Sequence, residues 1–166
     1  MPALYLTIWI ALLLFAAAET GRAFAVRGST PPGWAWWAFT LGLALALIHT
    51  LLSFHIVHDW DHADAVRSTA LQTQATYGVP AGWGVYVNYA FFAVWLADAW
   101  WWRAAPRAVR PPAVTWTLRA FYMIVIFNAA VVFAIGPRRI LGLVLVSWLA
   151  RVWGQPATTA PSSPRR

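Results

Sequence analysis

The sequence predicts an all-α integral membrane bundle of four transmembrane helices, plus a short fifth helix that either crosses the bilayer or lies in its interface. Hydrophobic residues make up 61% of the 166-residue chain and charged residues only 10%, whereas a soluble domain carries about 25% charged residues. The chain also holds thirteen tryptophans, a residue that concentrates at membrane–water interfaces. Such a chain has too few charges to cover a water-exposed surface.

Residues 3–26 form the first expected helix. This segment is apolar through Ala18 and then reaches Glu19 and Arg22. The stretch 23–25 would suit a signal-peptide cleavage site, but the segment has no positive leading region and its apolar run is long for a signal. We therefore expect a retained helix.

Three further helices are expected to begin directly after prolines. Proline at a helix start has its φ angle already set and lacks an N–H group that would be unpaired there in any case. Each segment is long enough to cross roughly 30 Å of hydrocarbon. The expected ranges are residues 34–57, 81–102 and 113–135.

The fifth expected helix, residues 139–153, follows Gly136 and Pro137 and is short for a crossing. It would cross a thinned bilayer or lie in the interface. Together the helices form one transmembrane domain over residues 1–153. The tail 154–166 is rich in proline, serine and threonine and is expected to be disordered.

Arginine positions predict an orientation in the cytoplasmic membrane of a bacterium. The connections after the first and third helices are rich in arginine, and the positive-inside rule places them in the cytoplasm. The N-terminus is then outside and the C-terminus inside. With five crossings most arginines lie on the inner side, whereas with four the asymmetry disappears, which favours five. The arginines form no stripe, so nucleic acid is not an expected partner.

Six polar residues inside the expected helices fall into two layers when helix positions are converted to depth at 1.5 Å per residue. The inner layer is Glu19, Asp98 and Arg119, and the outer layer is His49, Asn88 and Asn128.

Polar groups inside a bilayer are costly and are usually paired or functional. Arg119 is the expected partner of Asp98, as a structural ion pair or as part of a proton or anion relay. Glu19 has Arg22 three residues later, within its own helix. The outer layer would hydrogen-bond between helices, or anchor a quinone, a pigment or a lipid headgroup.

A cluster of histidine and aspartate follows the second helix. Residues 55–64 hold three His and three Asp, in a chain with only four His and five acidic residues. If the second helix continues through residue 62, four of these side chains share one face, and imidazole with carboxylate suits a transition metal such as Fe, Cu or Zn. The alternative is a hydrophilic helix end facing water. The candidate metal ligands are His55, His58, Asp59 and His62.

No motif in the sequence specifies a reaction, so whether the protein is an enzyme stays open. The chain has no cysteine, which excludes thiolate sites. We expect an accessory or structural subunit that packs against other membrane subunits, or against copies of itself, through tryptophan-rich helices. The alternative is a metal-binding, redox or proton-transfer protein that uses the His/Asp cluster. Residues 31–37 resemble the tryptophan-rich sensory/translocator proteins, but the rest of the chain does not follow that pattern and no family is assigned.

Overall fold

The structure, a computed structural model, describes residues 2–25, 30–108 and 110–155, and within these residues it contains six α-helices, one π-helix and no strand. The all-α expectation is confirmed for this part of the chain. The expected disordered tail lies outside the described residues from residue 156 onward. The elements are α1 (Pro2–Ala23), α2 (Gly33–Val57), α3 (His62–Tyr77), α4 (Gly84–Ala104), α5 (Pro112–Phe127), the π-helix η1 (Asn128–Val132) and α6 (Pro137–Trp153).

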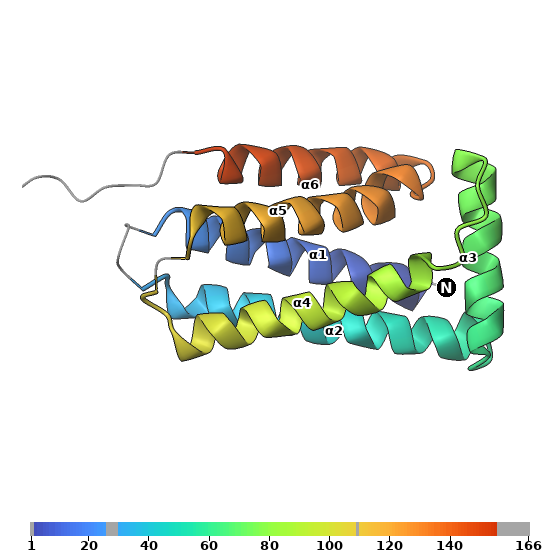
Figure 1. The fold of residues 1–166 in the computed structure, drawn as a ribbon, viewed down its shortest axis with the longest axis horizontal. Helices are drawn as coiled ribbons and strands as arrows, with labels where there is room; N and C mark the ends of the chain where they lie inside the picture. The colour runs from blue at the N-terminus through green and yellow to red at the C-terminus, as the bar shows by residue number, and fades with distance from the viewer. Residues whose placement is uncertain (1, 26–29, 109, 156–166) are drawn as a thin grey trace, which may run out of the picture.

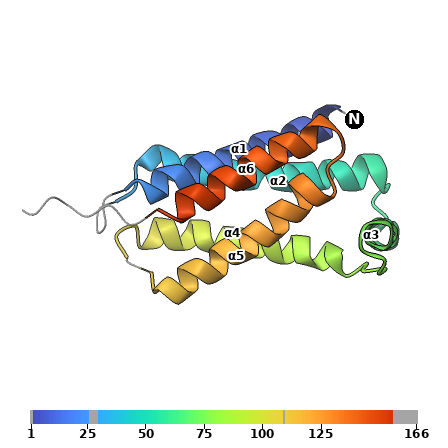
Figure 2. The same ribbon diagram turned by 90° about the horizontal axis from the view of Figure 1, so that it is seen from above.

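Five helices lie lengthwise and one lies crosswise (Figure 1). α1, α2, α4, α5 and α6 run along the long axis, and α3 crosses one end of the bundle, as the view in Figure 2 also shows. We call this the α3 end; α1 begins there and the α5–α6 connection lies there. The opposite end, where α1, α4 and α6 finish, holds Arg22 and Arg110, and we call it the arginine end.

The second helix does not continue to residue 62, so that expectation was wrong. α2 ends at Val57, and the chain turns through Asp59 and Trp60, whose φ angles are +45° and +61°. Aspartate tolerates this left-handed conformation better than most residues. Asp61 then starts α3, because its side chain accepts a hydrogen bond of 2.8 Å from the N–H of Ala63.

Aromatic side chains fill the centre of the bundle. Phe15 of α1, Phe39 of α2, Trp95 of α4 and Tyr122 of α5 are all almost fully buried. The ring of Phe15 lies 5.0 Å from that of Trp95 and 5.1 Å from that of Tyr122, in edge-on geometries that aromatic pairs prefer. This cluster joins four of the five lengthwise helices.

The expected helix over 113–135 is regular only to Phe127. η1 follows, and the N–H of Phe133 donates to the carbonyl of Asn128 over 2.9 Å, one residue wider than an α-helical bond. α6 packs tightly against this bulge at Gly142, where an added Cβ would fall on the carbonyl oxygen of Ala130. The close approach of α6 to η1 therefore requires a glycine at position 142.

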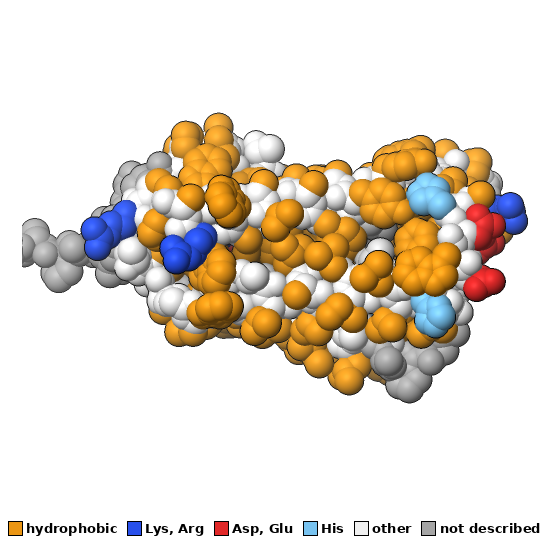
Figure 3. All heavy atoms as spheres, turned by 90° about the horizontal axis from the view of Figure 1, so that it is seen from below, with side chains coloured by type: hydrophobic (Ala, Val, Ile, Leu, Met, Phe, Trp, Pro, Cys, Tyr) orange, Lys and Arg blue, Asp and Glu red, His pale blue; other side chains and the backbone are white. Residues whose placement is uncertain are grey.

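Three helical stretches among the described residues are long and apolar enough to cross a membrane: Leu4–Ala23, Gly33–Val57 and Pro112–Val132. The expectation of four such helices is therefore supported for three. α4 is not among them, because Asn88, Asp98 and its many Trp and Tyr residues lower its mean hydropathy. Figure 3 shows an apolar surface along the middle of one face, with basic side chains at one end and, at the α3 end, acidic and histidine side chains beside a further basic one.

Candidate functional site

The expected outer-layer residues line two adjoining cavities beneath α3. One cavity has a volume of 340 Å³ and is lined from α1, α2, α3, α4, α5 and η1, with His49 and Asn88 among its residues. The second has a volume of 360 Å³ and includes Asn88 and Asn128. Because Asn88, Thr69 and Gln72 line both, the two form one region between α3 and the ends of the lengthwise helices.

Polar residues line the first cavity from α2 and its C-terminal end, from α3 and from α4, whereas α1, α5 and η1 contribute only apolar residues. The polar groups are two imidazoles, two amides, three hydroxyls and one phenol: His49, His58, Gln72, Asn88, Thr50, Ser53, Thr69 and Tyr89. Phe54, Phe91 and Phe92 supply flat apolar walls. A cavity with apolar walls and a few converging polar groups is the usual form of a small-molecule site.

His49 is held in one tautomer. Its Nδ1 lies 2.8 Å from the carbonyl oxygen of Leu4, and because a carbonyl can only accept, Nδ1 carries the proton and donates. The Nε2 atom of His49 is then an acceptor. The hydroxyl of Thr7 lies 3.4 Å from the same Nδ1.

Asn128, the first residue of η1, ties α3 to the bundle. Its side-chain oxygen accepts a hydrogen bond from the hydroxyl of Tyr77, the last residue of α3, and its amide nitrogen donates to the carbonyl of Ile124 over 2.8 Å. The interhelical hydrogen bonding expected for the outer layer thus occurs at His49 and at Asn128, but to different partners.

The four candidate metal ligands do not come together. Among the described residues, no group of three or more His, Asp or Glu side chains is placed to hold a metal ion. The turn at Asp59 and Trp60 separates His55, at the end of α2, from His62, at the start of α3. The predicted Fe, Cu or Zn site therefore has no support in the geometry.

Each histidine has another contact instead. His58 Nδ1 lies 2.7 Å from the Asp64 carboxylate. The ring of His62 lies 5.8 Å from that of Tyr86 and 6.0 Å from that of Tyr89, and the ring of His55 lies 6.1 Å from that of Trp60. The His58–Asp64 pair closes the corner between α2 and α3 and holds His58 at the cavity wall.

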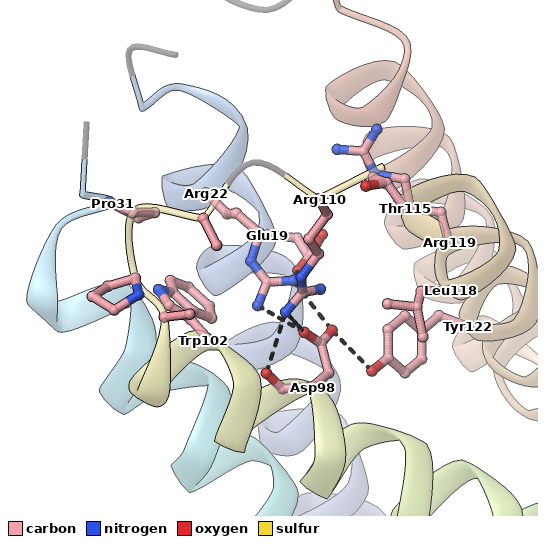
Figure 4. A pocket seen from close by; sticks show the side chains of 13 residues that line it. Glu19, Arg22, Pro31, Asp98, Trp102, Arg110, Thr115, Leu118, Arg119 and Tyr122 are labelled. Atoms are coloured by element: carbon pink, nitrogen blue, oxygen red, sulfur yellow. Dashed lines mark hydrogen bonds and ion pairs between the residues drawn. The ribbon is translucent and has the colours of Figure 1, made fainter. Parts of the chain in front are cut away.

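The prediction that Arg119 pairs with Asp98 was wrong, and the Asp98 side chain has other partners. Its carboxylate is paired with Arg110 and with Arg22, whose two terminal nitrogens lie 3.2 and 3.3 Å from it, and it accepts a hydrogen bond of 3.1 Å from Tyr122. Figure 4 shows these groups converging on Asp98. Arg119 instead donates to the carbonyl of Trp153 over 3.3 Å.

Glu19 is paired as expected, with Arg22 at 2.8 Å. Its other oxygen accepts a hydrogen bond of 2.8 Å from the indole of Trp153. Glu19 and Asp98 are each 3% exposed, so a single guanidinium, Arg22, joins two buried carboxylates.

Several site residues were not predicted from the sequence. Arg110 belongs to a connection, where no helical period fixes its direction, and Gln72 and Thr69 belong to the unexpected helix α3. Tyr122 and Trp153 read as ordinary aromatic residues of apolar helices. The only indication of their role in the sequence is that buried carboxylates such as Glu19 and Asp98 require hydrogen-bond donors.

Comparisons of the chain with protein-family models, with curated proteins and with solved structures gave no match.

Proposed function

We propose that this chain is an integral membrane protein with five crossings that binds a small lipid-soluble ring compound of the quinone class beneath α3. The observation that carries the proposal is the pair of cavities there, in which neutral polar side chains lie beside apolar and aromatic ones.

Five crossings are supported by the direction of the helices. α4 and α6 lie alongside the three helices that are apolar enough to span, and run between the same two ends (Figures 1 and 2). The acidic residue within α4, Asp98, does not face lipid because it is buried and paired, and the basic residue Arg103 lies in the last turn of the helix, at the arginine end. In this arrangement the arginine end is cytoplasmic by the positive-inside rule, and α3 lies at the outer surface.

A quinone suits the cavity because its chemistry matches the lining. Its two carbonyl oxygens accept hydrogen bonds, and Gln72, Asn88 and Tyr89 carry donors. Its flat ring fits against Phe54 and Phe91, and its apolar tail would leave the cavity into the lipid. No redox step is assigned to the protein itself.

The accessory-subunit role stays a prediction. The apolar surface between the two charged ends would serve lipid and partner helices alike (Figure 3). A cavity with converging polar groups is not needed for packing alone, which is why binding is the proposed function.

Binding of a short-chain ubiquinone to the detergent-purified protein, measured by titration calorimetry, tests the proposal. Gln72→Leu and Asn88→Leu should each weaken binding about fivefold to tenfold, because each removes a hydrogen bond worth about 1 kcal/mol. Gln74→Leu is the matched control, since Gln74 lies on the same helix and is exposed like Gln72, but does not line either cavity. Absence of ubiquinone binding by the unaltered protein, or equal weakening by all three changes, would overturn the proposal.

A further inference from the structure

A third cavity lies at the arginine end, opposite the cavities beneath α3. Its volume is 210 Å³, and five charged side chains line it together with Thr115 and Tyr122 (Figure 4). The charged residues are Glu19, Arg22, Asp98, Arg110 and Arg119. Three guanidinium groups and two carboxylates leave one positive charge in excess.

Both carboxylates already have donors on every oxygen. The Oδ1 atom of Asp98 is paired with Arg110 and accepts a hydrogen bond from Arg22. Its Oδ2 atom accepts hydrogen bonds from Arg22 and Tyr122. Glu19 receives Arg22 on Oε1 and the Trp153 indole on Oε2. The acids of the cavity are therefore satisfied by two of its three arginines.

Arg119 carries the excess charge. Among the described residues it forms no ion pair, and its hydrogen bond goes to the neutral carbonyl of Trp153. Its guanidinium carbon lies 5.3 Å from the ring of Trp116 and 5.8 Å from that of Trp153. These contacts hold the group at the cavity, where water is partly excluded, and among the described residues no carboxylate lies within ion-pair distance of it.

We propose that this cavity binds a phosphate group, with Arg119 as its principal ligand and Arg110 beside it. A guanidinium presents N–H groups in a fork that matches two phosphate oxygens. The cavity also borders the first turn of α5 at Thr115, where the helix dipole is positive. The phosphate is that of an anionic lipid headgroup or a free phosphate ion; the lipid source rests on the proposed membrane crossing, whereas the free ion does not.

Two experiments distinguish these sources. In phosphate-free maltoside detergent, melting of the purified protein is followed while inorganic phosphate is added, with chloride at equal ionic strength as reference. In a second arm, the protein is placed in nanodiscs of phosphatidylcholine alone or with phosphatidylglycerol, and the melting temperatures are compared. Stabilisation in the first arm identifies the free ion, and stabilisation only in the second identifies the lipid headgroup.

Arg119→Gln should weaken the apparent affinity about tenfold or more in whichever arm responds, because the charge-assisted fork is lost. Arg119→Lys keeps the positive charge without the forked N–H groups, so its apparent affinity should lie between those of the unaltered protein and Arg119→Gln. Arg103→Gln is the control, since Arg103 is exposed at the same end and does not line the cavity. Circular dichroism and an unchanged elution volume in size-exclusion chromatography show that each variant is folded. No stabilisation in either arm, or equal responses of Arg119→Gln and Arg103→Gln, would overturn the phosphate site and leave the cavity beneath α3 unaffected.

Discussion

Asp98 shows how a charged side chain is kept inside an apolar bundle. Its carboxylate receives Arg22 from α1, Arg110 from the α4–α5 connection and Tyr122 from α5. Taking away the negative charge leaves two guanidinium groups close together without their shared partner. Removing one partner of a buried ion pair is among the most destabilising single changes.

Asp98→Asn should therefore lower the free energy of unfolding by about 3 kcal/mol. The measurement is reversible unfolding in mixed micelles followed by circular dichroism. Asp61→Asn is the matched control, since Asp61 is exposed and asparagine caps a helix as well as aspartate, so its effect should stay within about 0.5 kcal/mol. Equal losses for the two variants would contradict the assignment of Asp98 as the centre of the network.

A second change identifies the partner. Arg110→Gln added to Asp98→Asn should restore part of the lost stability, with a coupling of about 1 kcal/mol or more, because the two residues are in direct contact. Arg119→Gln added to Asp98→Asn should show a smaller coupling, since Arg119 contacts Trp153 instead. The same unfolding measurement gives both coupling energies. A larger coupling of Asp98 with Arg119 than with Arg110 would instead support the ion pair expected from the sequence.

Sequence positions predicted the depth of these residues but not their direction. Glu19, Asp98 and Arg119 were expected at one depth, and all three line one cavity. The rotation of each helix about its axis decides which side chains meet, and this depends on packing that a single sequence does not contain. Arg110 pairs with Asp98, but it belongs to a connection, where no helical periodicity predicts the direction of its side chain.

At the scale of elements, prolines marked the starts of α2, α5 and α6, but not that of α4, which was expected directly after Pro80 and begins at Gly84. α2 begins directly after Pro32, and α5 and α6 begin with Pro112 and Pro137. The break between α2 and α3 was missed because it uses no glycine or proline: the chain turns at Asp59 and Trp60, which adopt positive φ angles. The separated histidines, and with them the loss of the predicted metal site, follow from that turn.

The close approach of α6 to η1 gives a prediction for a single methyl group. Gly142→Ala should destabilise the bundle by about 2 kcal/mol, because its Cβ would meet the backbone of Ala130 and force the helices apart. Gly33→Ala is the control, since nothing lies within 4 Å of an added Cβ at the start of α2. Thermal unfolding of both variants in detergent tests this, and tolerance of alanine at both glycines would show that the tight packing is absent.

At the scale of the whole molecule, the bundle has two chemically different ends separated by an apolar length. The α3 end holds the neutral polar cavities, and the arginine end holds the charged one. The apolar composition predicted the bundle, but it could not predict α3, because a polar helix lying across a bundle leaves no apolar period. The proposed binding at the α3 end and the proposed orientation in the membrane both require that a bilayer separates these two ends.

Single-cysteine labelling tests that separation most directly, because the chain has no cysteine of its own. Arg67→Cys lies on the exposed side of α3, and Arg107→Cys is exposed at the arginine end. With a membrane-impermeant maleimide, Arg67→Cys should label in intact cells, and Arg107→Cys should label only in inverted membrane vesicles. Labelling of both variants from the same side would contradict the account.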